Sequence, residues 1–159
     1  MSQYKDVIAD YLRYAERNPV AGKPAELYDP ANYILQLGGK RVRPLLALLG
    51  YHLIDSDYKK AMPLASAVEV FHNFTLMHDD IMDNADVRRG QPTVHVKWNP
   101  NIAILSGDLM LVKAYQLIQS LDTNPATMSQ IFNGFGKMAE AVCVGQQYDM
   151  NFETQETVT

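Results

Sequence analysis

The sequence predicts an all-α fold, formed as one helical domain over residues 1–159. Asp29-Pro30, Asn99-Pro100 and Asn124-Pro125 each place a capping side chain directly before a proline, which is the order found at helix starts. Alternation of apolar and polar residues, the signal of a strand, does not recur along the chain. A length of 159 residues with 47% hydrophobic residues suits one well-buried domain.

The helices follow in order from these signals. An amphipathic first helix ends before Asn18-Pro19, Gly38-Gly39 ends the second, and Pro44 opens the third. The expected helices are residues 2–17, 30–37, 44–54, 58–83, 100–121 and 125–150. The connection at residues 84–99 is longer than most links between helices, and long loops often carry function.

Composition narrows the classes of function. A net charge of -4 and a pI near 5.5 argue against a nucleic-acid-binding protein. The acid-bearing N-terminus does not resemble a secretory signal, and the longest apolar run, residues 45–54, is too short to span a membrane, so we expect a cytoplasmic protein. One cysteine, Cys143, excludes an internal disulfide and is expected to be a buried, inert thiol.

The segment "HDDIMD", residues 78–83, concentrates carboxylates at the end of an apolar helical pattern. Asp79 and Asp83 are four residues apart, so they share a helix face about 6 Å apart, with Asp80 alongside. Such carboxylates repel each other unless a cation lies between them, and Mg²⁺ prefers this kind of oxygen ligand. The sequence fits neither an EF-hand nor a zinc site. A solvated acidic helix end is the alternative, although the helix dipole opposes it.

Two basic clusters accompany these acids. "GGKRVRP", residues 38–44, places Lys40, Arg41 and Arg43 at a helix start, where an anion would meet cations and free backbone N–H groups together. A flexible basic turn in water is the alternative. Arg88 and Arg89 form the second cluster, and His72 lies seven residues before Asp79 on the same helix face. Together the clusters suit two polyphosphate ligands, one bridged by metal and one held by cations alone.

Four motifs resemble those of the polyprenyl synthetase family, the trans-isoprenyl diphosphate synthases. "GGKRVRP" is similar to GGKRxRP, "HDDIMD" contains DDxxD, "RRGQPTVH" is similar to RRGxPTxH, and "GQQYD" is similar to GQxxD. The resemblance implies a helical bundle of the isoprenoid synthase type, Mg²⁺ as cofactor and usually a homodimer. It implies that isopentenyl diphosphate is condensed with an allylic diphosphate (dimethylallyl, geranyl or farnesyl) to a short-chain all-trans prenyl diphosphate.

The resemblance also implies roles for individual residues. Asp79 and Asp83 would bind magnesium, with Asp80 assisting, and Arg88 would hold the allylic diphosphate. The isopentenyl diphosphate would be held by Lys40, Arg43, His72 and Arg89. Phe74, five residues before Asp79, would limit chain length without help from the small Thr75, which implies farnesyl or geranylgeranyl diphosphate as the product.

The family's second aspartate-rich motif does not follow Asp149. We therefore expect a chain truncated before that motif, corresponding to the N-terminal half of a synthase, and we do not expect these residues alone to supply the whole catalytic site. A non-catalytic, diphosphate-binding subunit of a heteromeric synthase is the alternative. A class I terpene cyclase would not need "GGKRVRP", and a plain helical interaction module would explain neither charge cluster.

Overall fold

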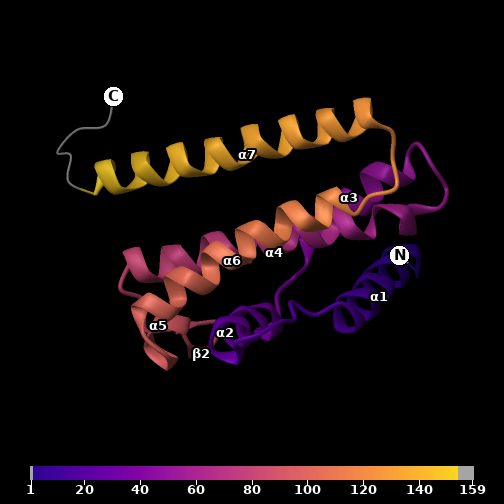
Figure 1. Ribbon diagram of the computed structural model, residues 1–159. Helices are drawn as coiled ribbons and strands as arrows, with labels where there is room; N and C mark the ends of the chain where they lie inside the picture. The colour runs from indigo at the N-terminus through magenta and orange to yellow at the C-terminus, as the bar shows by residue number, and fades with distance from the viewer. Residues whose placement is uncertain (1, 154–159) are drawn as a thin grey trace. The chain divides into compact units, whose positions relative to one another are not determined.

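The computed structural model describes residues 2–153, and their regular structure is helical apart from one short β-hairpin (Figure 1). This confirms the all-α prediction. The chain divides into two compact units, with the boundary in the sequence between Leu121 and Asp122. Within the described residues, no helix is both long and apolar enough to cross a membrane.

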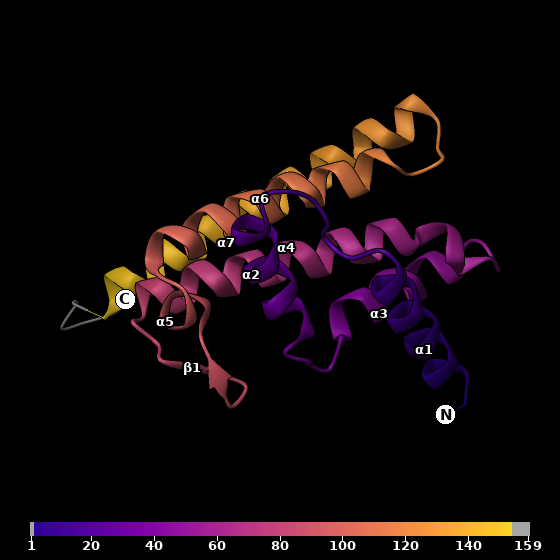
Figure 2. The ribbon, with the colours of Figure 1, turned by 60° about the horizontal axis from the view of Figure 1, so that its bottom comes forward.

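The first unit is built around two long helices, α4 (Met62–Met82) and α6 (Pro100–Gln119), which lie side by side (Figures 1 and 2). Gly107 permits their close approach, because a Cβ atom at this position would overlap the ring of His78 on α4. The remaining elements of this unit are α1 (Ser2–Arg17), α2 (Ala25–Gln36), α3 (Val42–His52), the 3₁₀-helix η1 (Tyr58–Ala61), β1 (Val87–Arg88), β2 (Gln91–Pro92) and α5 (Val94–Lys97).

The shorter helices α1, α2 and α3 pack against the α4–α6 pair. Val7 and Tyr11 of α1 belong to one buried cluster with Leu48 of α3 and Ala65 of α4. α2 packs against α6, and Ser106 Oγ donates a hydrogen bond to the Leu27 carbonyl. α1 and α3 therefore pack against one end of α4, and α6 packs along its length. This packing gives the polar residues of α4 a rigid support.

Two predicted helix starts are confirmed with their capping interactions. The Asn99 side chain accepts a hydrogen bond from the Ile102 N–H at 2.9 Å, and the Asn124 side chain accepts one from the Thr127 N–H at 2.9 Å. The second of these opens α7 (Pro125–Phe152), which forms the second unit. In both cases the proline occupies the first helical turn, where its missing N–H leaves no bond unmade.

Replacing Asn99 with alanine should lower the free energy of unfolding by about 1 kcal/mol, because the cap satisfies an N–H that α6 itself cannot pair. Thermal and urea unfolding followed by circular dichroism would measure the change. Asn101→Ala, an exposed change two residues further on, is the matched control and should be near neutral. Equal stability of the two variants would contradict the assignment of Asn99 as an energetically important cap.

Other helix boundaries differ from the prediction. α2 begins at Ala25 rather than at residue 30, so Pro30 lies inside the helix and is buried there. The predicted helix 58–83 begins as the 3₁₀-helix η1 before α4, and α3 begins at Val42. The predicted loop at residues 84–99 contains the β1–β2 hairpin and α5. Cys143 on α7 is exposed, contrary to the expected buried thiol.

Candidate functional site

The acidic residues lie at the C-terminal end of α4. Asp80 is 2% exposed, and its Oδ1 atom accepts a hydrogen bond from Arg88 Nε at 2.7 Å. A second nitrogen of the same guanidinium lies 3.3 Å from Asp79 Oδ2. Asp83 is the C-terminal cap of the helix and is exposed, with its backbone N–H bonded to the Asp79 carbonyl at 2.9 Å. Arg88 therefore brings two of the three aspartates together.

Asp80 occupies an unusual environment for a carboxylate. Burial raises its pKa, while the hydrogen bond and positive charge of Arg88 act in the opposite direction. Its Oδ2 atom is buried and has no hydrogen-bond partner among the described residues. A buried oxygen without a partner, next to a second carboxylate, fits the ligand chemistry of Mg²⁺.

Nowhere in residues 2–153 do three histidine, cysteine, aspartate or glutamate side chains gather closely enough to hold one metal ion. Mg²⁺ sites that include substrate phosphates commonly use only one or two carboxylates. The residues at the end of α4 thus fit a site of that kind and do not form a cage made of protein ligands alone.

The β1–β2 hairpin directs two neighbouring arginines to different places. Arg89 and Gly90 form its turn with φ values of 55° and 78°, the left-handed conformation required at both positions of a type I′ turn. Arg88 reaches Asp79 and Asp80, whereas Arg89 donates a hydrogen bond to the Gly38 carbonyl. The turn therefore connects the acidic end of α4 with the segment that precedes α3.

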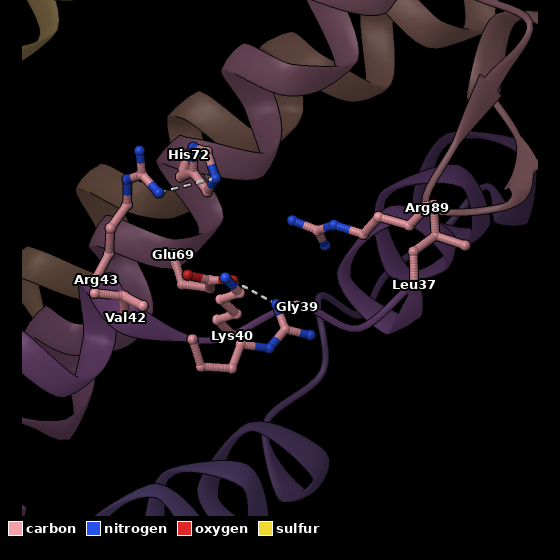
Figure 3. Close-up of a pocket in the computed structure, with 9 residues that line it drawn as sticks. Leu37, Gly39, Lys40, Val42, Arg43, Glu69, His72 and Arg89 are labelled. Carbon is pink, nitrogen blue, oxygen red and sulfur yellow. Dashed lines mark hydrogen bonds and ion pairs between the residues drawn. The ribbon is translucent and has the colours of Figure 1, made fainter.

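Arg89 belongs to a cavity of about 480 Å³ at the start of α3. Figure 3 shows its guanidinium extending towards the side of α4 that carries Glu69 and His72. The cavity gathers four basic groups that the sequence analysis had assigned to one ligand: Lys40, Arg43, His72 and Arg89. These residues come from three segments, so only the fold brings them together.

His72 is held against Arg43 in this cavity. Arg43 Nη1 lies 3.2 Å from His72 Nε2, and Figure 3 shows the two side chains facing each other. Burial and the charge of Arg43 both lower the pKa of His72. The lowered pKa favours the neutral imidazole, whose Nε2 can accept the Arg43 hydrogen bond, and this leaves the remaining guanidinium donors for an anion.

Phe74 and Thr75 lie between the two charged regions on α4. Phe74 is partly buried, and its ring contacts Phe71 and His78 with centroid distances of 5.6 Å and 4.8 Å. Thr75 Oγ1 donates to the His72 carbonyl at 2.8 Å, so its hydroxyl is used within the helix. The aromatic ring is thus the bulkier feature on this stretch of α4.

Two residues at or next to the basic cavity had not been predicted from the sequence: Glu69, which lines it, and Asn73, which contacts Glu69. Glu69 was assigned no role, yet its carboxylate accepts a hydrogen bond from Arg41, which had been grouped with the cations available to a ligand. Asn73 was also missed, and its side-chain nitrogen lies 3.2 Å from Glu69 Oε1. The available signal was the i, i+4 spacing of Glu69 and Asn73 on a helix that already carried His72.

Comparisons with known proteins agree on the family. The polyprenyl synthetase family model matches residues 24–159. A geranylgeranyl diphosphate synthase from Methanosarcina mazei is 42% identical over 137 residues, which are 86% of this chain and 42% of that protein. A farnesyl diphosphate synthase from Geobacillus stearothermophilus is 40% identical, and the match covers 96% of this chain and 53% of that protein.

Solved structures give the same result. A crystal structure of a geranylgeranyl pyrophosphate synthase is 49% identical with a TM-score of 0.93, and the match covers 98% of this chain and 47% of that one. A geranylgeranyl pyrophosphate synthetase from Geoglobus acetivorans has a TM-score of 0.93 at 36% identity, with 98% and 51% of the two chains covered. The chain spans about half the length of the relatives that it matches.

Proposed function

The chain belongs to the polyprenyl synthetase family, and from that premise we propose that it supplies both diphosphate-binding regions of a short-chain prenyl diphosphate synthase. The proposed reaction joins isopentenyl diphosphate to an allylic diphosphate and releases inorganic diphosphate. The observation that carries the proposal is the β1–β2 turn, from which Arg88 reaches the aspartates of α4 while Arg89 enters the basic cavity. Two adjacent arginines thus serve two separate anion-binding regions.

The allylic diphosphate is assigned to the acidic end of α4. Asp79 and Asp83 would hold magnesium with Asp80 assisting, and Arg88 would bind the diphosphate directly. Magnesium, when bound, acts as a Lewis acid that stabilises the charge gained by the leaving diphosphate. Asp79 and Asp80 hold the Arg88 guanidinium in place before any substrate arrives, so this donor is preorganised for the charge that develops as the allylic C–O bond breaks.

The isopentenyl diphosphate is assigned to the basic cavity, with Lys40, Arg43, His72 and Arg89 as its ligands. Lys40, Arg43 and Arg89 are positively charged, and the cavity lining contains one acidic residue, Glu69. A diphosphate would offset the remaining charge and use the donors of Arg43 and Lys40. The role of His72 is to position Arg43 through their hydrogen bond. Binding of the diphosphate therefore requires no proton transfer by His72.

Turnover with isopentenyl diphosphate, an allylic diphosphate and Mg²⁺, with products identified by mass, tests the proposal. The expected product is an all-trans prenyl diphosphate longer than the allylic substrate, formed when the chain acts within the complete enzyme. Here the complete enzyme means a synthase that also supplies the second aspartate-rich motif. Binding of both diphosphates without turnover in the complete enzyme would instead favour a non-catalytic subunit of a heteromeric synthase. We further propose a cytoplasmic homodimer, which light scattering and cell fractionation would test.

Phe74→Ala is expected to lengthen the product by whole isoprene units, because it removes an aromatic ring five residues, or about 7.5 Å, along α4 from Asp79. Mass analysis of the products would measure the change from the proposed farnesyl or geranylgeranyl diphosphate. Phe71→Ala removes the same ring from a neighbouring buried position and should reduce stability without changing product length. An unchanged product distribution in Phe74→Ala would refute the chain-length role.

A further inference from the structure

Arg41 differs from the other cations of the basic cavity because its guanidinium is paired with a protein carboxylate, that of Glu69. Its Nη1 atom donates to Glu69 Oε1, and its Nη2 atom donates to the Leu35 carbonyl at 2.6 Å. The side chains of Arg41 and Glu69 are 12% and 6% exposed. Arg41 is therefore directed towards a protein carboxylate rather than offered to a ligand.

This ion pair connects three helices. Leu35 lies near the end of α2, Arg41 is the N-terminal cap of α3, and Glu69 lies within α4. Asn73, one turn beyond Glu69, supports the carboxylate from the same helix through its side-chain nitrogen, which also donates to the Glu69 carbonyl at 2.8 Å. The pair is thus anchored on rigid elements at both ends.

α1 also approaches the pair. Burial raises the pKa of Tyr11, and the negative charge of Glu69 raises it further. Tyr11 is 3% exposed and belongs to the apolar cluster between α1, α3 and α4. The Arg41–Glu69 pair is therefore mostly buried on the wall of the basic cavity, where electrostatic interactions are stronger than at the open surface.

The segment held by this pair has little conformational preference of its own. Gly38 and Gly39 have φ values of 82° and 137°, and Arg41 itself has a φ of 49°. Glycine adopts such angles readily but does not enforce them, and they are uncommon for arginine. Lys40 directly precedes Arg41, and Arg43 follows it by two residues. A fixed Arg41 consequently sets the direction in which both of these cations leave the backbone.

Building on the proposed function, we propose that Arg41 and Glu69 form a positioning pair that fixes the segment from Gly38 to Arg43 so that Lys40 and Arg43 face the isopentenyl diphosphate. In this proposal neither residue of the pair binds the substrate, because the charges of Arg41 and Glu69 are already paired with each other. If the pair positions the segment, and if instead Glu69 acts only through its charge, the loss of that charge has opposite effects on anion affinity. Removing the negative charge of Glu69 would strengthen anion binding if only charge mattered, whereas releasing Arg41 would weaken binding if position mattered.

Calorimetric titration with inorganic diphosphate in the absence of magnesium distinguishes the two roles. These conditions leave the cationic cavity as the binding site under test. We expect Glu69→Gln to bind inorganic diphosphate about tenfold more weakly than the natural protein, as for the loss of one coupled contact. Arg41→Lys keeps the charge but cannot make both bonds of the guanidinium, and it should weaken binding to a similar extent.

Two further variants control for net charge and for folding. Glu26→Gln removes one negative charge from an exposed position on α2 and should leave affinity unchanged. The double variant Arg41→Met/Glu69→Met replaces the pair by apolar side chains, which a buried site often tolerates. If Glu69→Gln fails to fold, this variant takes its place, and it is also expected to bind about tenfold more weakly.

Steady-state kinetics of the complete enzyme provide an independent readout. The KM for isopentenyl diphosphate should rise in Glu69→Gln and Arg41→Lys, while the KM for the allylic diphosphate stays unchanged. Tighter or unchanged binding in the folded variants would overturn the positioning role and leave the proposed function intact. Failure of the natural protein to bind inorganic diphosphate at all would overturn both, since the pair would then have no anion site to position.

Discussion

Asp79→Asn is expected to lower kcat/KM of the proposed condensation by roughly 10²–10³-fold, the range observed when one preorganised electrostatic group is removed from an active site. The asparagine keeps the shape of the side chain but loses the charge that would hold magnesium. Asp79 also contributes to the placement of Arg88, whose guanidinium lies 3.3 Å from its Oδ2 atom. The variant would therefore lose both the metal ligand and part of the support for the neighbouring cation.

The effect of Asp79→Asn should depend on magnesium. Because the remaining carboxylates would bind the proposed ion more weakly, activity should saturate at a higher Mg²⁺ concentration than in the natural protein. Asp57→Asn removes the same charge from an exposed residue outside both anion-binding regions and serves as the control. Full activity with an unchanged magnesium dependence would exclude Asp79 as a metal ligand.

Local signals in the sequence predicted part of the fold correctly. Asn99 and Asn124 cap their helices as expected because a cap depends on the residue and its next three neighbours alone. The same Asx-Pro pattern at Asp29-Pro30 was misleading, since Pro30 lies within α2 and is buried. Packing of α2 against α4 and α6 outweighs the local cost of this proline. This packing involves residues far away in the sequence, so a local pattern could not predict it.

Some features of the candidate site were likewise predictable from local sequence, and others were not. The aspartates of residues 79–83 were recognisable because their spacing along one helix is itself the signal. The Arg41–Glu69 bond was not recognisable, because its partners are 28 residues apart and meet only after α3 packs on α4. The contact between Arg88 and Asp80 likewise depends on a hairpin within residues that had been expected to form a loop.

The β1–β2 hairpin allows the two proposed substrate sites to be tested separately. Arg88 and Arg89 have the same side chain, are adjacent in sequence and differ in their partners, which are the α4 aspartates and the Gly38 carbonyl respectively. Arg88 is the last residue of β1, whereas Arg89 lies in the turn with a left-handed φ of 55°, so the two side chains leave the backbone in different directions. Their neutral variants should therefore affect different substrates.

Arg88→Gln is expected to raise the KM for the allylic diphosphate, and Arg89→Gln the KM for isopentenyl diphosphate, each by about tenfold to a hundredfold for the loss of a charge-assisted hydrogen bond. Each variant is the control for the other, since both lose one positive charge at nearly the same place. Initial rates measured over a grid of the two substrate concentrations would separate the two KM values. A rise in the same KM for both variants would mean that the arginines serve one diphosphate, and the assignment of separate anion regions to the two sides of the turn would be wrong.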